Sequence, residues 1–256
     1  MIGGVLLDIS GVLYQGERPI AGAVDAVERL RESGIPIRFL TNSTRRPKRT
    51  IVRKLNVLGF DAGDDEVLTP AAAACTWLNA HGFSPHLLVH PDLEEDFSDC
   101  VGAASKAIVI GDAAEYFSYE RLNAAFRELV AGAPLLALAA NRVFRDTDGE
   151  LSLDAGAFVR ALEYSSGTEA LILGKPERSF FRAGTDSLGC APSDVAMVGD
   201  DAESDVAGAL SAGIGMGILV QTGKYREGDE NRFGPAPTSV ATDIAEAVDT
   251  IIAASR

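Results

Sequence analysis

Short apolar runs alternate with amphipathic stretches along most of the chain. One amphipathic stretch places Val24, Val27 and Leu30 on a single helical stripe and is followed by Gly34, a residue typical of helix ends. The apolar runs are rich in Val, Ile and Leu, as buried strands are. The clearest of them predict strands at residues 4–7, 35–40, 170–173, 195–198 and 217–220. This alternation predicts an α/β protein with a Rossmann-like core around a parallel sheet.

A second set of alternating elements occupies the middle of the chain. Its pattern predicts strands at residues 86–89, 107–110 and 134–138 and a helix at residues 119–130. A block with its own strands and helices is too structured for one long loop, so we interpret it as an inserted α/β domain. The predicted division is a discontinuous core at 1–70 and 168–256, with the insert at 71–167.

Charge and composition narrow the classes of partner. The chain has 256 residues, with 23 Lys and Arg against 37 Asp and Glu, which gives a formal net charge of −14. Its 46% hydrophobic content is that of an ordinary globular protein. Because the acidic excess is spread along the chain, its field repels nucleic acids and anionic membranes, and neither is an expected partner. An anionic substrate would need a locally positive site.

The cysteines and the first residues bear on the compartment. Cys75, Cys100 and Cys190 show no C-x-x-C spacing, and their odd number suits neither a disulfide framework nor a structural zinc site. We therefore expect reduced cysteines. Residues 1–8 lack the basic and apolar segments of a secretory leader, which predicts a cytoplasmic protein.

Polar residues follow the predicted core strands. Taken one by one, such residues are most often helix caps or turn residues. Open parallel sheets, however, bind ligands at the carboxyl ends of their strands. Four strand ends of one sheet would bring a set of chemically reactive groups to one crevice: Asp8, Thr41 with Asn42, Lys175, and Asp200 with Asp201.

The charges of this set favour phosphoryl transfer. Two carboxylates such as Asp8 and Asp200 repel by about 4 kcal/mol at about 4 Å in an effective dielectric of about 20. A divalent cation with oxygen ligands removes that repulsion, and Mg²⁺ suits a site with so few carboxylates. Asp8 could then attack phosphorus, while Thr41, Asn42 and Lys175 stabilise the oxygens on which charge develops.

Ordered motifs connect these residues to a known family. The motifs are 7-LDISGVL-13, Thr41-Asn42, Gly174-Lys175-Pro176, and Gly199-Asp200-Asp201 followed by Asp205. In this order they resemble the four motifs of the haloacid dehalogenase (HAD) superfamily of phosphatases. The large insert between the second and third motifs resembles the α/β cap (type 2) of subclass IIA. A cap of this kind is expected to cover the crevice and to choose the substrate.

The resemblance implies a role for each residue. Asp8 would carry the phosphoryl group as an aspartyl-phosphate. Asp8, the backbone carbonyl of Ser10 and Asp200 would hold Mg²⁺. Asp205 would orient Lys175 or a metal-bound water, so the implied catalytic set is Asp8, Lys175 and Asp205. The implied substrate contacts are Asp8, Ser10, Thr41, Asn42 and Lys175. For Asp201, a helix cap or a surface charge remains the simpler interpretation.

Ser10 departs from the wider superfamily, where most phosphatases carry a second Asp that acts as acid and base. A serine hydroxyl cannot play that role near neutral pH. Such help matters least for leaving groups that depart easily, which favours phosphoramidates (phosphohistidine, phospholysine) or inorganic pyrophosphate. Further segments resemble a branch of the family with those substrates: 6–14, 117–119, 161–164 and 222-TGKYR-226.

Two alternative functions remain open, and a third is disfavoured. The protein could hydrolyse small phosphomonoesters such as sugar phosphates, or it could be a catalytically weak phosphate-binding regulator because of Ser10. A phospho-accepting receiver domain is disfavoured, because its acidic pair precedes the phospho-acceptor, whereas here Asp8 comes first. The expected partner is a small phosphorylated substrate or a phosphorylated side chain, and a homodimer is expected from the resemblance alone.

Overall fold

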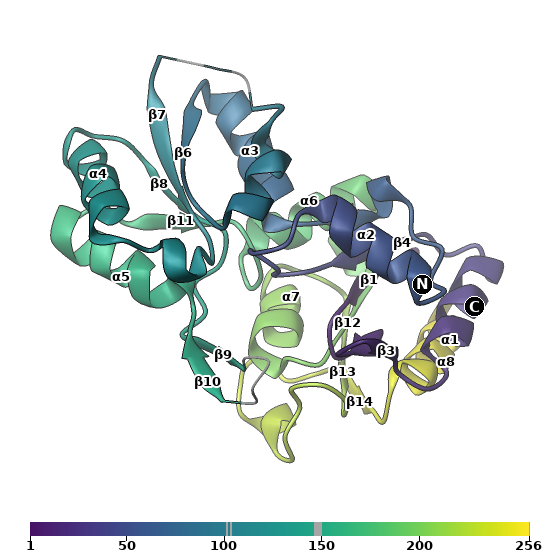
Figure 1. Cartoon of the computed structure of the whole chain (residues 1–256). Helices are drawn as coiled ribbons and strands as arrows, with labels where there is room; N and C mark the ends of the chain where they lie inside the picture. Colours follow the sequence, from purple (N-terminus) through teal and green to yellow (C-terminus); the bar gives the residue numbers. More distant parts are fainter. Residues whose placement is uncertain (101, 103, 146–149, 256) are drawn as a thin grey trace. The chain divides into compact units, whose positions relative to one another are not determined.

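The computed structural model describes residues 1–100, 102, 104–145 and 150–255, which form two compact units. We call Met1–Thr41, Arg49–Leu68 and Lys175–Arg256 the core unit. Asn42–Lys48 and Thr69–Gly174 form the insert unit. Each unit has its own parallel sheet and its own apolar interior, so each is described by itself (Figure 1).

The core unit is built on a six-stranded sheet in the order β14-β13-β12-β1-β4-β5, in which every neighbouring pair is parallel. The strands β1 and β12 therefore lie side by side although the chain between them includes the whole insert unit. A small antiparallel pair, β2 with β3, follows β1. The strand bounds are β1 Gly4–Asp8, β2 Tyr14–Gln15, β3 Arg18–Pro19, β4 Ile37–Leu40, β5 Val67–Leu68, β12 Val195–Gly199, β13 Met216–Val220 and β14 Ser239–Ala241.

Helices cover the two faces of the core sheet. Alternate residues of β1 point to opposite faces, as a strand requires. Val5 and Leu7 lie in the cluster formed with α1, α2 and α8, whereas the Leu6 side chain is the nearest neighbour of Gly184 in α6 on the other face. The helix bounds are α1 Ala23–Glu32, α2 Lys48–Val57, α6 Arg178–Leu188, α7 Gly208–Ser211 and α8 Ile244–Ser255.

The insert unit has a four-stranded parallel sheet in the order β11-β8-β7-β6. Along β7, Ala107 and Val109 pack toward α3, whereas Ile108 and Ile110 pack toward α4 and α5, so helices cover both faces (Figure 1). An antiparallel pair, β9 with β10, precedes α5. The bounds are α3 Pro70–His81, β6 Ser84–Leu88, β7 Lys106–Ile110, α4 Tyr119–Val130, β8 Leu135–Ala137, β9 Val143–Arg145, β10 Leu151–Leu153, α5 Ala155–Ser166 and β11 Ala170–Ile172.

The predicted parallel-sheet α/β architecture is confirmed, with one strand assigned to the wrong sheet. The sequence predicted a core strand at residues 170–173, but β11 pairs with β8 in the insert unit. Lys175 is therefore the first residue of the core unit after the insert, and does not follow a strand of the core sheet. A short apolar run predicts that a strand exists. It does not predict which strand it pairs with, because pairing depends on contacts distant in sequence.

The expectation of three reduced cysteines is also wrong. Cys75, in α3, and Cys100 form a disulfide with a Cα–Cα distance of 5.5 Å, within the usual range for such bonds. Cys190 is free. The two paired residues are 25 positions apart, and the fold of the insert unit brings them together. Counting cysteines could not reveal this proximity.

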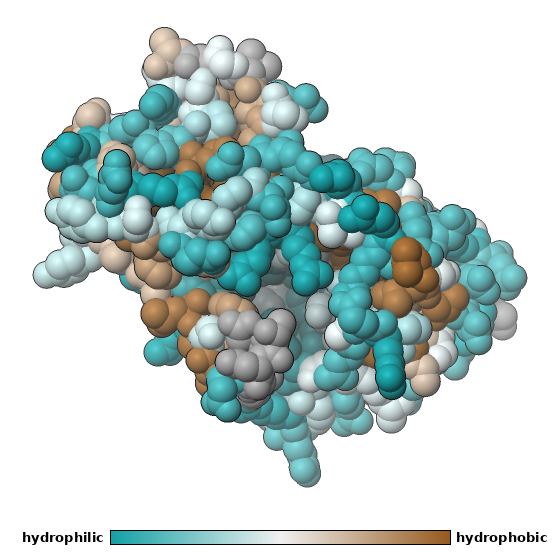
Figure 2. Space-filling view, viewed as in Figure 1, coloured by the Kyte–Doolittle hydropathy of each residue, from teal (hydrophilic) through white to brown (hydrophobic). Residues whose placement is uncertain are grey.

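The surface agrees with the charged composition. The face drawn in Figure 2 is dominated by hydrophilic residues, with smaller hydrophobic areas between them. Within the part of the chain that the structure describes, no helix has the length and hydropathy to cross a bilayer.

Candidate active site

The centre of the site is a buried cation between two buried carboxylates. Asp8 is the last residue of β1, and its side chain contacts the Lys175 ammonium. Lys175 Nζ also lies 2.7 Å from Asp205 Oδ1. Lys175 is 3% exposed and Asp205 1%. Burial of a lysine at this depth requires compensating negative charge, which these two acids provide.

Asp200 adds a third carboxylate to this centre. It directly follows β12, the strand beside β1, and is 3% exposed. Its Oδ2 accepts a hydrogen bond of 2.7 Å from the Lys224 backbone N–H. Carboxylate oxygens of Asp8, Asp200 and Asp205 all lie within 4.8 Å of one another. We call these three residues the acidic cluster.

Asp201 has a local structural role. Its carboxylate accepts hydrogen bonds from the backbone N–H groups of Glu203 and Ser204, and so caps the π-helical turn Ala202–Ala207. The Asp201 N–H in turn donates to Asp205 Oδ2 at 3.2 Å. The cap therefore holds in place the turn that carries Asp205, which agrees with the simpler of the interpretations that the sequence left for Asp201.

The remaining predicted residues are divided between the two units. Ser10 is exposed and forms a bridge with Tyr14 just after β1. Thr41 is buried, and because Asp8 pairs in register with Leu40, Thr41 follows at the same edge of the core sheet. Asn42 begins the insert unit, where its side chain lies close to Gly174. The structure thus brings Asp8, Lys175, Asp200 and Asp205 together and places Thr41 at their sheet edge.

Burial and mutual repulsion raise the pKa values of two of the acids. Burial raises the pKa of Asp8 to about 6, although Lys175 works against this rise. Burial, with repulsion from Asp205 and Asp8, raises the pKa of Asp200 to about 8. For Lys175, burial favours the neutral amine, but the attraction of Asp205 and Asp8 outweighs it and raises the pKa above the usual value. The two acids therefore stabilise the charged form of Lys175.

The acidic cluster fits a divalent cation. Three buried carboxylates face one buried ammonium, so the centre carries an excess of negative charge when the acids are ionised. The raised pKa values of Asp8 and Asp200 reflect the cost of burying these charges, to which repulsion within the cluster adds. Hard divalent cations prefer such all-oxygen donor sets, and Mg²⁺ uses one or two carboxylates in most of its sites. The donor chemistry therefore agrees with the predicted metal.

The sequence analysis missed three neighbours of the cluster in the segment after β13. Thr222 donates a hydrogen bond to the Gly11 carbonyl, Gly223 packs against Asp200, and Lys224 Nζ lies 3.2 Å from Asp201 Oδ2. The available signal was a polar Thr-Gly-Lys run that begins two residues after a strand of the core sheet. It entered the analysis only as part of a resemblance.

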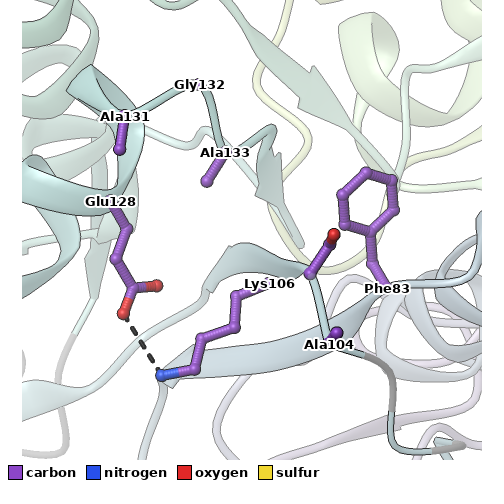
Figure 3. A pocket seen from close by; sticks show the side chains of 8 residues that line it. Phe83, Ala104, Lys106, Glu128, Ala131, Gly132 and Ala133 are labelled. Carbon is purple, nitrogen blue, oxygen red and sulfur yellow. Dashed lines mark hydrogen bonds and ion pairs between the residues drawn. The ribbon is translucent and has the colours of Figure 1, made fainter.

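A hollow in the insert unit has no connection with these residues. Its volume is about 390 Å³, and Figure 3 shows the ion pair between Lys106 and Glu128 on its wall. The hollow is lined by small residues around the turn after α4 and by Phe83, and none of the predicted site residues lines it.

Comparisons with known proteins agree with the fold and the motifs. A family model described as haloacid dehalogenase-like hydrolase matches residues 5–104, and a second, described as HAD-hydrolase-like, matches residues 172–247. The chain belongs to the haloacid dehalogenase-like hydrolases. The predicted relationship to HAD phosphatases of subclass IIA, and with it the predicted enzyme class, is confirmed.

Particular relatives cover nearly the whole chain. The chain is 42% identical to haloacid dehalogenase-like hydrolase domain-containing protein 2 of Bos taurus, over 97% of this chain and 95% of that protein. It is also 42% identical to phospholysine phosphohistidine inorganic pyrophosphate phosphatase of Danio rerio, over 97% of this chain and 94% of that protein. The p-nitrophenyl phosphatase of Archaeoglobus fulgidus has a similar structure, with a TM-score of 0.90, 26% identity, and coverage of 97% and 99%.

The raised pKa of Asp200 gives a prediction about stability. A raised pKa means that the folded protein holds this proton to a higher pH than the unfolded chain does. Without metal, the wild type should therefore lose stability as the pH rises from about 4 to about 8. Asp200→Asn removes this loss, so we expect it to raise the free energy of unfolding at pH 8 by several kcal/mol, with little effect at pH 4. Urea unfolding in EDTA measures both values.

Asp201→Asn is the matched control. Burial works to raise the pKa of Asp201, but Lys224 and the Ser204 N–H outweigh burial and lower it. This neighbouring substitution should therefore destabilise the protein at pH 8. If both variants lose stability at pH 8, the assignment of excess negative charge to the cluster is contradicted.

Proposed function

We propose that this enzyme is a Mg²⁺-dependent phosphohydrolase that acts through an aspartyl-phosphate on Asp8. The observation that carries the proposal is the buried arrangement of Asp8 and Lys175 beside Asp200 and Asp205. HAD-like family membership and relatives named as phosphatases support it.

Asp8 is suited to act as the nucleophile. It ends a fully buried strand, so its backbone is fixed, and the Lys175 contact orients its carboxylate. Lys175 also opposes the effect of burial on the pKa of this carboxylate. One Asp8 oxygen forms the bond to phosphorus while the bond from phosphorus to the leaving group breaks, with the electron pair departing on that group. Water then cleaves the aspartyl-phosphate, which releases phosphate and regenerates Asp8.

The cation would be held by the carboxylates of Asp8 and Asp200 and by the backbone carbonyl of Ser10. When bound, Mg²⁺ supplies positive charge that offsets the carboxylates and the phosphoryl oxygens. Asp205 keeps Lys175 in place through its 2.7 Å contact. Thr41, Asn42 and the Ser10 segment would bind the phosphoryl oxygens, and residues 71–167 would form the cap that selects the substrate.

The residue at position 10 favours substrates with a good leaving group. Ser10 stands two positions after the nucleophile and offers no carboxylic acid to protonate a poor leaving group. Phosphate leaves readily from pyrophosphate, and a protonated amine leaves readily from a phosphoramidate. The relative named phospholysine phosphohistidine inorganic pyrophosphate phosphatase supports the same class. We therefore propose phosphohistidine, phospholysine or pyrophosphate as substrates, free or, for the first two, on a protein side chain.

A second candidate function is hydrolysis of small phosphomonoesters. The structures of two p-nitrophenyl phosphatases favour it: that from Archaeoglobus fulgidus, and that from Thermotoga maritima at 28% identity and a TM-score of 0.89. A weak phosphatase retained as a phosphate-binding regulator is the third. The cytoplasmic location and the homodimer stay predictions.

Asp8→Asn tests the nucleophile. An amide is a very weak nucleophile and carries no charge, so turnover should fall by at least about 10³-fold on every substrate, with the fold retained. Steady-state phosphate release and circular dichroism measure the two properties. Asp194→Asn, at an exposed acid of the same unit, should leave turnover unchanged. Retained turnover in Asp8→Asn would refute the proposed nucleophile.

The substrate class is tested by comparing kcat/KM values. We expect phosphohistidine, phospholysine or pyrophosphate to exceed sugar phosphates by at least about 10-fold, because no acid assists departure of an alkoxide. Ser10→Asp should raise kcat/KM for the sugar phosphates and so reduce the difference between the two substrate classes. A wild-type preference for sugar phosphates would favour the phosphomonoester function, and Mg²⁺ binding without any turnover would favour the regulator.

A further inference from the structure

The segment after β13 contacts both of the loops that carry the proposed metal ligands. The Thr222 hydroxyl donates to the carbonyl of Gly11, the residue directly after Ser10. Two residues later, the Lys224 backbone N–H donates to Asp200 Oδ2 at 2.7 Å. These contacts join Gly11 of the first motif to Asp200 of the last, although the two residues are almost 190 positions apart in sequence.

Two glycines allow this close approach. Gly11 has a φ of 89° and Gly223 a φ of 63°, a left-handed conformation that favours glycine. A Cβ added to Gly223 would lie 1.9 Å from Asp200 Oδ2 and 2.6 Å from Gly11 Cα. A Cβ added to Gly11 would lie 2.0 Å from the same Asp200 oxygen. The Asp200 carboxylate is therefore enclosed between two backbones that have no room for a side chain.

Lys224 also fixes the residue after Asp200. Its Nζ lies 3.2 Å from Asp201 Oδ2, and its side chain remains 68% exposed. Asp201 is the cap of the turn that carries Asp205. One short segment thus holds the Gly11 peptide, the Asp200 carboxylate and the cap beside Asp205.

We propose that Thr222, Gly223 and Lys224 form a clasp that positions the acidic cluster for a divalent cation. The clasp acts through Asp200 and through the peptide that follows Ser10, so its members are positioning residues. This inference rests on the proposed function in taking Asp200 and the Ser10 carbonyl as metal ligands.

The clasp has a physical task in this protein. Ionised carboxylates within 4.8 Å of one another repel, and without restraint they would separate. A hydrogen bond from Lys224 N–H to one Asp200 oxygen fixes that carboxylate and leaves its other oxygen for a ligand role. Tying Gly11 to Thr222 fixes the distance between the Ser10 peptide and Asp200. Ligands already held in place bind a cation more tightly, because less freedom is lost on binding.

Thr222→Val is the most direct test, because it removes one hydroxyl, changes no charge and leaves the hydrogen bond from Lys224 N–H to Asp200 in place. We expect Mg²⁺ to bind about three- to tenfold more weakly, measured by isothermal titration calorimetry without substrate. Thr222→Ser should restore affinity to within about twofold. With substrate present, the Mg²⁺ concentration for half-maximal turnover should rise by the same factor in Thr222→Val, while kcat at saturating Mg²⁺ stays near that of the wild type.

Thr238→Val is the matched control. The Thr238 hydroxyl accepts a hydrogen bond from the Gly217 N–H at the other end of the same region, so its loss should lower the melting temperature without changing Mg²⁺ affinity. Gly223→Ala is a second variant, in which the added Cβ meets the Asp200 carboxylate, and it should weaken Mg²⁺ binding by more than tenfold.

The outcomes separate the clasp from the proposed function. Unchanged Mg²⁺ affinity in both Thr222→Val and Gly223→Ala, with a wild type that binds Mg²⁺, would overturn the clasp and leave the phosphatase proposal intact. Equal weakening in Thr238→Val would overturn it too, because the effect would then follow stability alone. A wild type that binds no Mg²⁺ would contradict the cofactor itself, and the clasp with it.

Discussion

An imbalance of buried charge controls the chemistry of this protein. Asp8, Asp200 and Asp205 place three carboxylates around a centre from which water is largely excluded, and Lys175 supplies one compensating charge. The pKa values of Asp8 and Asp200 rise because burial penalises their charged forms and because the acids repel one another. A site of this kind gains stability from any bound species that brings positive charge. The same excess that weakens the metal-free protein thus prepares it for a divalent cation.

The parallel sheet makes this concentration of charge possible. Because β1 and β12 are neighbours in register, their carboxyl ends deliver Asp8 and Asp200 to one edge. Lys175 approaches from the point where the chain leaves the insert unit, and Asp205 from a capped turn after β12. The fold brings these side chains close together, and hydrogen bonds orient them. The clasp after β13 contributes to this orientation and supplies none of the reacting groups.

Much of the fold and the identity of the central residues could be predicted from the sequence. Buried strands such as β1 and β12 are continuous apolar runs, and a polar residue at each strand end marks the sheet edge. The two wrong predictions concerned features that depend on contacts distant in sequence. The strand β11 joins the insert sheet, and Cys75 contacts Cys100 only in the folded insert unit. The role of the Thr222–Lys224 segment was missed for the same reason, since it depends on contacts with Gly11 and Asp200, which are distant in sequence.

The account depends on a cation shared by two acids that lie far apart in the chain. The most direct measurement is a crystal structure of the wild-type protein grown with Mn²⁺ in place of Mg²⁺, with anomalous data collected to locate the metal. We expect one strong anomalous peak within about 2.5 Å of a carboxylate oxygen of Asp8, one of Asp200 and the Ser10 carbonyl oxygen. Anomalous density elsewhere in the core unit, with the acidic cluster lacking metal at saturating Mn²⁺, would contradict it.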